Sequence, residues 1–146
     1  MARQPQPLRL RAEDAEDLKV VSAALQDAVA KVGDIRHDAQ ARTLTIALNR
    51  FRWEDERRRE RVRSALQLGG VLSVQARRVK REPADAVVEL LALEFQPGEA
   101  PGGELTVSFA GGGDLRCQVE AVDAVLADVS PPWPSRSRPR HDLTGS

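Results

Sequence analysis

The chain has 146 residues, of which 22 are basic and 22 acidic, and its formal net charge is therefore zero. A chain of this length fits one domain, which buries roughly two thirds of its unfolded surface and needs no disulfide or metal to fold. Apolar and charged shares of 41% and 30% exclude a disordered or fibrous protein. The uncharged stretches are far shorter than the roughly 20 apolar residues that cross a bilayer, which excludes a transmembrane helix.

The N-terminus and the cysteine count indicate a reducing compartment. Residues 1–10 lack the apolar core and cleavage site of a secretory signal, and we therefore expect a cytoplasmic protein. The single cysteine, Cys117, cannot form an internal disulfide, and the two histidines, His37 and His141, lie far apart in the sequence. We expect no metal and no cofactor. Cys117 falls on the inward side of a predicted strand, where a free thiol acts as a small apolar group.

The zero net charge hides a segregation along the chain. Residues 42–81 contain 12 basic and 4 acidic side chains (net +8), whereas residues 82–128 contain 1 basic and 10 acidic side chains (net −9). If the fold keeps these parts on separate faces, the molecule is dipolar and suited to oriented association. If their strands interleave, the charges offset one another locally.

The first third of the chain predicts a helix and a strand. Between Ala12 and Val29 apolar residues recur three or four apart, with acidic residues early, which indicates a helix beginning near Ala12. Its end is open, because Gly33 and the β-branched residues before it indicate an extended chain. After a polar turn, strict alternation over residues 43–49 predicts a half-buried strand.

The segment from 54 to 74 permits two interpretations. Residues 54–60 are highly charged and predict an exposed loop or a single helical turn. Apolar residues then approach and leave Gly69–Gly70, which is the pattern of a hairpin joining strands over 62–68 and 71–74. A helix over 54–68 is the alternative, because its arginines favour a helix although they provide almost no apolar stripe.

The second half predicts three more strands and a closing helix. A nearly continuous apolar run over 87–95 is typical of a well-buried strand. Alternation over 105–109 and 114–119 predicts a hairpin around Gly111–Gly113, rather than a phosphate-binding loop, because no helix and no lysine follow the glycines. Helical spacing over 119–129 predicts a short C-terminal helix.

These elements predict an α+β domain over residues 8–129, preceded by a flexible N-terminus (1–7) and followed by a Pro/Ser/Arg-rich tail (130–146). Sequential hairpins imply an antiparallel sheet, and about seven strands usually curl or split. We therefore expect a strongly bent sheet or a partly closed barrel, with the N-terminal helix beside it and the C-terminal helix as a cap. The pleckstrin-homology-type roll has this strand count and order.

Two segments carry the candidate binding residues. The end of the strand over 43–49 concentrates two of the five aromatic residues beside an arginine, a combination that is enriched at interfaces but also completes cores. A Gln–Asp pair late in the helix either caps it or hydrogen-bonds to the next strand. The candidate residues are Gln26, Asp27, Asn49, Arg50, Phe51, Trp53 and, in the tail, His141.

The stretch Arg50–Arg63 is the most basic part of the chain. Its seven arginines suit phosphate contacts. Four acidic residues in the same stretch and the scarcity of aromatic stacking groups favour a solvated charged loop instead. An acidic partner surface, including that of a second copy, fits this charge equally well.

Five segments are distinctive in combination: Ser22–Val29, Val32–Ile35, Leu48–Glu54, Leu90–Phe95 and Phe109–Arg116. Together they resemble an alphaproteobacterial family known only as a domain of unknown function. The resemblance spans about Leu8 to His141 and implies no activity, substrate or cofactor. The family's tryptophan and Pro-x-His near the C-terminus match Trp133 and Pro139–His141, which implies a tail that docks through Trp133 and His141. The family usually has aspartate where this chain has Arg52, and no charge-specific role carries over there.

Three functional hypotheses remain. The first is a non-catalytic protein-binding or assembly module that contacts a partner or a second copy through the Asn49–Trp53 edge, since no constellation of acid, base, nucleophile or metal ligands is evident. The second is an enzyme or enzyme subunit with a small-molecule site around Gln26, Asp27, Asn49 and Arg50, which requires these residues to converge. The third is weak nucleic-acid binding through Arg50–Arg63, with an affinity that falls steeply with salt.

Overall fold

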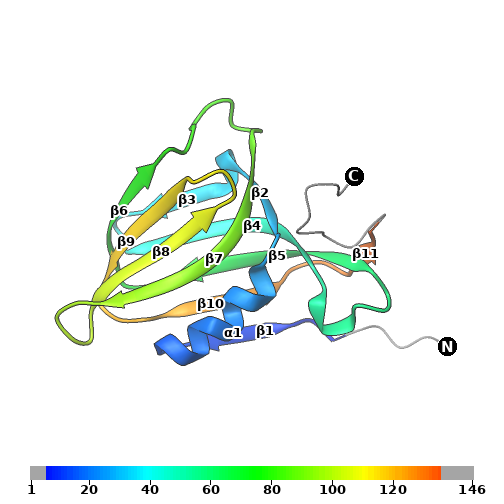
Figure 1. The fold of residues 1–146 in the computed structure, drawn as a ribbon, viewed down its shortest axis with the longest axis horizontal. Helices are drawn as coiled ribbons and strands as arrows, with labels where there is room; N and C mark the ends of the chain where they lie inside the picture. Colours follow the sequence, from blue (N-terminus) through cyan, green and yellow to red (C-terminus); the bar gives the residue numbers. More distant parts are fainter. Residues whose placement is uncertain (1–5, 136–146) are drawn as a thin grey trace.

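The computed structural model describes residues 6–135, which form one α-helix and an antiparallel sheet of eleven strands (Figure 1). The first half contributes β1 (Arg9–Ala12), α1 (Ala15–Leu25), β2 (Val29–Lys31), β3 (Ile35–Asp38), β4 (Thr43–Phe51) and β5 (Glu60–Leu68). The second half contributes β6 (Val71–Arg77), β7 (Val87–Pro97), β8 (Gly103–Phe109), β9 (Asp114–Val119), β10 (Ala124–Asp128) and β11 (Trp133–Pro134). Short 3-10 turns, η1 (Val32–Asp34) and η2 (Trp53–Asp55), precede β3 and follow β4.

The sheet is open and follows the order β1-β10-β5-β4-β2-β7-β8-β9-β6, with β3 paired to β4 and β11 paired to β5. The α+β class and the antiparallel sheet are confirmed. The prediction of about seven strands in a strongly bent sheet or partly closed barrel is wrong, because short strands add to the count and β1 and β6 form separate, unpaired edges. The sheet order also places strands that are distant in sequence side by side, as it does β1 and β10.

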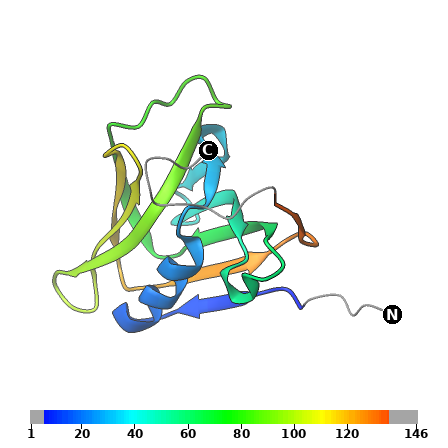
Figure 2. The same cartoon turned by 45° about the vertical axis from the view of Figure 1, so that its right-hand side comes forward.

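Helix α1 lies across one face of the sheet and contacts β1, β4, β7 and β10 (Figures 1 and 2). The Asp14 carboxylate caps its N-terminus by accepting from the Asp17 N–H at 2.7 Å. Leu18, Val21 and Leu25 form its buried stripe. The predicted helix is confirmed, but it begins at Ala15 rather than near Ala12, because Arg9–Ala12 pairs with β10 as an edge strand.

The predicted strand over 43–49 and the hairpin over 105–119 are confirmed as β4 and as β8 with β9. The glycine pair Gly69–Gly70 does not close a hairpin. β5 pairs with β4 and β10, whereas β6 pairs with β9 at the other end of the sheet order. The helical alternative over 54–68 is wrong as well, since these residues form η2, a turn and β5.

The predicted C-terminal helix over 119–129 is also wrong, because this segment contains β10. Val122, Ala124 and Leu126 are buried on one face with a period of two, and β10 fills the gap between β1 and β5. The spacing of the apolar residues is compatible with both a helix and a strand. The segment forms a strand because it pairs with β1 on one side and with β5 on the other. β7 is a strand as predicted, but Val87 and Leu91 are exposed rather than well buried.

A continuous cluster of apolar side chains fills the space between α1 and the sheet. Its members come from every long strand and include Leu44, Ile46, Leu48, Leu66, Leu68, Leu90, Leu105 and Leu126. Within residues 6–135 no helix has both the length and the apolar character needed to cross a membrane.

Candidate functional site

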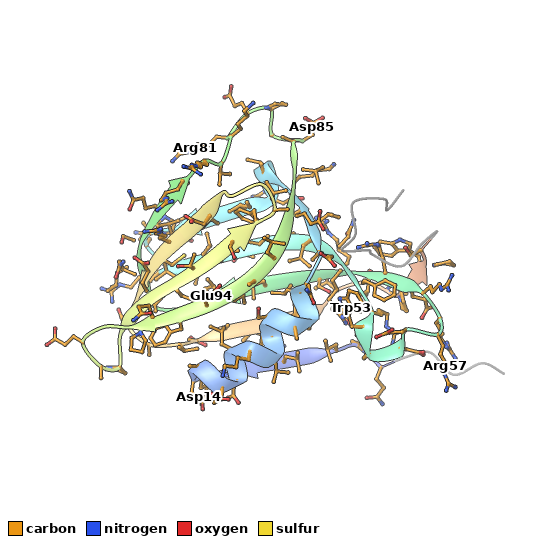
Figure 3. The ribbon with its side chains drawn as sticks, in the orientation of Figure 1. Asp14, Trp53, Arg57, Arg81, Asp85 and Glu94 are labelled. Atoms are coloured by element: carbon orange, nitrogen blue, oxygen red, sulfur yellow. The ribbon has the colours of Figure 1, made fainter. Side chains whose placement is uncertain are left out.

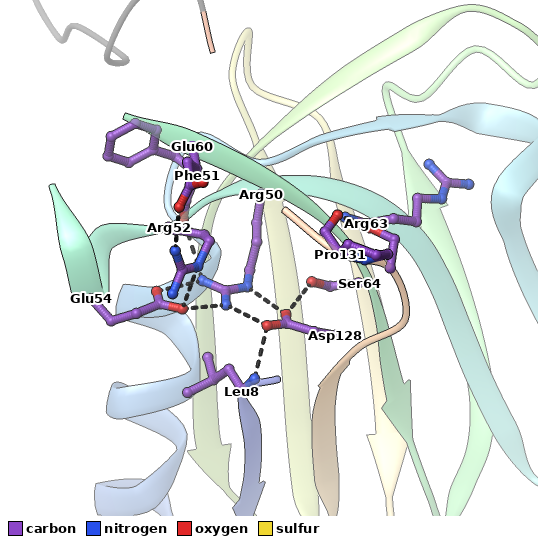
Figure 4. Close-up of polar contacts among 11 residues, drawn as sticks. Leu8, Arg50, Phe51, Arg52, Glu54, Glu60, Arg63, Ser64, Asp128 and Pro131 are labelled. Atoms are coloured by element: carbon purple, nitrogen blue, oxygen red, sulfur yellow. Dashed lines mark hydrogen bonds and ion pairs between the residues drawn. The ribbon is translucent and has the colours of Figure 1, made fainter. Parts of the chain in front are cut away.

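Arg50, near the end of β4, is completely buried and held between two carboxylates (Figure 4). Its Nε and Nη2 donate to the two oxygens of Asp128 at 3.0 Å each, and its Nη1 and Nη2 donate to the two oxygens of Glu54 at 2.8 and 2.7 Å. A weaker bond of 3.3 Å reaches the Phe51 carbonyl. All five N–H groups of this guanidinium are therefore used within the protein.

Asp128, at the end of β10, links Arg50 to two further parts of the chain. Its carboxylate also accepts from the Ser64 hydroxyl at 2.7 Å and from the Leu8 backbone N–H at 2.8 Å. Burial alone would raise the pKa of Asp128, but these bonds and those from Arg50 outweigh it and hold the pKa below its usual value. The same balance lowers the pKa of Glu54 and raises that of Arg50. All three groups are therefore charged near neutral pH.

A second pair extends the network along the loop between β4 and β5. Nη1 of Arg52 donates to Glu60 at 2.6 Å, and the Arg52 backbone N–H donates to the Glu60 carbonyl at 2.9 Å. The Trp53 indole N–H donates to the Gln26 carbonyl at 3.1 Å, and the Trp53 ring meets Phe51 edge to face at 4.7 Å. The loop is thus fixed at both ends to the sheet and at Trp53 to the end of α1.

A cleft of about 440 Å³ opens beside this network. It lies between the segment Gln6–Pro7, the buried Arg52 and the segment Asp128–Pro132, with Val62 at its base. The Asp128 carboxylate that borders it is already committed to Arg50, Ser64 and Leu8. The cleft therefore offers shape and apolar surface, but its two ionised lining residues, Asp128 and Arg52, are already paired with Arg50 and Glu60.

A second cluster of polar side chains lies on the face of β4 opposite to Arg50. Asn49 is the neighbour of Arg50 on β4 and points to the opposite face, because side chains alternate along a strand. Its Oδ1 accepts from Nη1 of Arg63 at 3.2 Å, and Nη2 of Arg63 donates to Asp34 at 3.0 Å. Asn49 is thus engaged by an arginine that itself belongs to an ion pair.

Asp27 and Arg61 lie near this second group. Asp27 is buried in a left-handed conformation with φ of 63°, and its backbone N–H donates to the Leu90 carbonyl. Burial lowers the pKa of Arg61, although the charges of Asp27 and Glu89 oppose this shift. Arg61 thus lies near two carboxylates.

The structure brings some of the candidate residues together and separates others. The Gln26 carbonyl, Phe51 and Trp53 meet directly, whereas Arg50 faces the opposite side of the sheet from Asn49. His141 and the rest of Pro139–His141 lie outside the described residues. Trp133, from the same tail, lies in β11 and pairs with Arg61.

Sequence reasoning missed the carboxylates that neutralise the buried arginine. Glu54 and Glu60 belong to the stretch that we interpreted as a solvated loop, yet they bind Arg50 and Arg52. An available signal was the alternation of Leu44, Ile46, Leu48 and Arg50, which places the arginine on the core face of β4. Asp128 gave no comparable signal, because its segment was assigned to a helix.

Residues 6–135 contain no cluster of three or more His, Cys, Asp or Glu side chains placed to hold a metal ion. Cys117 is fully buried, and burial, followed by the charge of Glu104, raises its pKa to about 12. A thiol in this state is protonated and unreactive near neutral pH.

A family model described as "Protein of unknown function (DUF2948)" matches residues 8–141. The chain belongs to this family. The resemblance found in the sequence is thereby confirmed, and the match includes Arg50, Glu54 and Asp128, which form the buried network. No curated protein and no solved structure matches the chain.

Proposed function

We propose that this protein is a non-catalytic binding module whose loop between β4 and β5 contacts an acidic surface of a partner protein. The observation that carries the proposal is the contrast between the two parts of this loop. Its ends are fixed by the pairs Arg50–Glu54 and Arg52–Glu60. Its tip exposes the three consecutive arginines Arg57–Arg59, of which Arg57 is labelled in Figure 3.

The tip arginines are largely unneutralised. Arg58 forms an exposed pair with Asp55 at 3.3 Å, but Arg57 and Arg59 form no ion pair with any residue of the described chain, 6–135. A rigid loop loses little conformational entropy on binding, which favours affinity. The positive charges of Arg57 and Arg59, beside the surface pair of Arg58, fit an acidic protein face and speed its encounter.

The two other hypotheses fit the geometry less well. A small-molecule site around Arg50 requires guanidinium N–H groups that reach a ligand, yet all five are donated to Asp128, Glu54 and Phe51. Nucleic-acid binding through Arg50–Arg63 loses the buried Arg50 and Arg52 as phosphate contacts. The protein-binding hypothesis uses only arginines that are exposed.

Site-specific photocrosslinking in cells tests the proposal. A crosslinking residue at Arg57 is expected to capture one abundant partner or a second copy. The charge reversals R57E and R59E, introduced with the crosslinker at the exposed position Glu56, are expected to abolish capture. The matched control is R36E, because Arg36 is an exposed arginine on β3. Capture that survives R57E/R59E, or is lost equally in R36E, would refute the proposal. A salt-sensitive shift of labelled RNA at low salt, lost in R57E/R59E, would replace it with the nucleic-acid hypothesis.

A further inference from the structure

A second hollow lies at the end of the molecule away from the Arg57–Arg59 loop, between two strand edges that do not pair with each other. Among the strands of residues 6–135, β3 pairs only with β4, and β6 pairs only with β9. The space between them has a volume of about 420 Å³, which is within the range of small-molecule sites. It is lined by Val32, Ile35, His37, Leu44, Val74, Ala76, Val79, Arg81 and Leu115.

The lining separates into an apolar wall and a cationic rim. Seven of the nine lining side chains are apolar, and Ile35, Val74 and Ala76 are only partly buried although they pack against the core. His37 and Arg81, both exposed, are the polar lining residues.

The rim belongs to a strongly basic segment. Residues 77–81 contain four cationic side chains and no acidic one, and this segment begins the connection that arches from β6 to β7 (Figure 3). Arg77 is 3.8 Å from Asp114, whereas Arg78, Lys80 and Arg81 form no ion pair within the described residues 6–135. A smaller hollow of about 250 Å³ adjoins the first, shares Val32 and Val79 with it, and is bordered by Arg78 and Lys80.

We propose that this hollow binds an anionic amphiphile, a molecule with an unbranched apolar tail and a carboxylate or phosphate head. The tail would cover Ile35, Val74 and Ala76, and burial of its methylenes would supply most of the affinity. The head would lie against Arg81 at the rim, where a guanidinium binds either anion through charge-assisted hydrogen bonds. The proposal does not depend on the protein partner of the β4–β5 loop.

Fluorescence titration with 11-(dansylamino)undecanoic acid tests this site on the full chain. We expect a saturable rise in dansyl emission that dodecanoate or dodecyl phosphate reverses and dodecyltrimethylammonium does not. The substitution R81E should weaken binding about tenfold or more, which is the usual effect of losing one charge-assisted hydrogen bond. R57E is the matched control for charge and should bind as the wild type does.

A second pair of variants tests the apolar wall. V74W fills the hollow and should abolish binding, whereas L72W places the same side chain on an exposed position of β6 and should not. Circular dichroism shows whether V74W folds, and R81E keeps the test decisive if it does not. Equal displacement by all three amphiphiles, or unchanged affinity in R81E, would overturn the proposal. Displacement by dodecyl phosphate at a clearly lower concentration than by dodecanoate would support the proposal and identify phosphate as the preferred head group.

Discussion

Removing the Asp128 carboxylate should destabilise the protein far more than removing the Glu54 carboxylate, although both bind Arg50. The Asp128 side chain is 2% exposed and accepts four hydrogen bonds, whereas that of Glu54 is 34% exposed and water can replace it. Breaking a buried pair by removing one partner costs about 3–5 kcal/mol, because the remaining charge is left uncompensated. A partly exposed pair contributes about 1 kcal/mol or less.

Urea denaturation of D128A and E54A measures this difference as a shift in midpoint at constant slope. The double variant R50M/D128L removes the charge together with its partner and should recover much of the stability lost in D128A, because an apolar replacement of a whole buried pair is often neutral. Equal destabilisation by D128A and E54A, or a loss below about 1 kcal/mol in D128A, would refute the reasoning.

Three further predictions concern titration, the thiol and a close backbone approach. The pKa of Asp128 is lower in the folded protein than its ordinary value of 3.8. The ionised carboxylate therefore stabilises the fold fully above pH 3.8, and this stabilisation is lost as the pH falls through the folded pKa. Urea midpoints between about pH 5 and pH 2 should fall more steeply for the wild type than for D128N. Cys117 should react with a thiol reagent at pH 8 only on unfolding, and rapid labelling of the native protein would contradict its burial. G103A should lower the unfolding free energy by about 1–3 kcal/mol, because its methyl group would lie 2.4 Å from the Gln96 carbonyl; G98A, whose nearest neighbour is at 3.4 Å, is the control, and equal effects would count against this explanation.

Local patterns predicted the elements whose partners lie nearby in the chain. β8 and β9 are joined by Gly111–Gly113 and pair with each other, so that their alternation and their glycine turn are sufficient evidence. The strand β4 is equally clear, because strict alternation covers residues 43–49 of its nine-residue length. In both regions the buried face is decided by residues close in sequence.

Elements with distant partners were not predictable in this way. Gly69–Gly70 has the composition of a hairpin turn, but the Gly69 N–H donates to the Asp123 carbonyl and the chain continues at the other end of the sheet order. The segment containing β10 shows both helical and strand spacing, and its conformation depends on strands more than 50 residues earlier. The same limit applies to the candidate site, where Arg50 was identified but Asp128 was not.

The charge segregation along the chain is partly offset in three dimensions. The basic and acidic parts are joined by the pairs Arg42–Glu120, Arg50–Asp128 and Arg77–Asp114. At these pairs the strands of the basic and acidic parts interleave, so that their charges offset one another locally. The exposed arginines of the β4–β5 loop and of residues 78–81 remain as local basic surfaces.

The position of β10 has a consequence for synthesis on the ribosome. In the described part of the chain β1 pairs with no strand except β10, and the Leu8 N–H donates to Asp128, which is 120 residues away in the sequence. A nascent chain that has emerged only as far as β9 therefore exposes one edge of β5 and holds a buried arginine without its main counter-charge. Such long-range closure folds slowly and leaves unpaired strands open to aggregation. We expect the native sheet to form only after the five residues of β10 have been synthesised. Chains shortened before Ala124 are expected to require a chaperone to remain in solution.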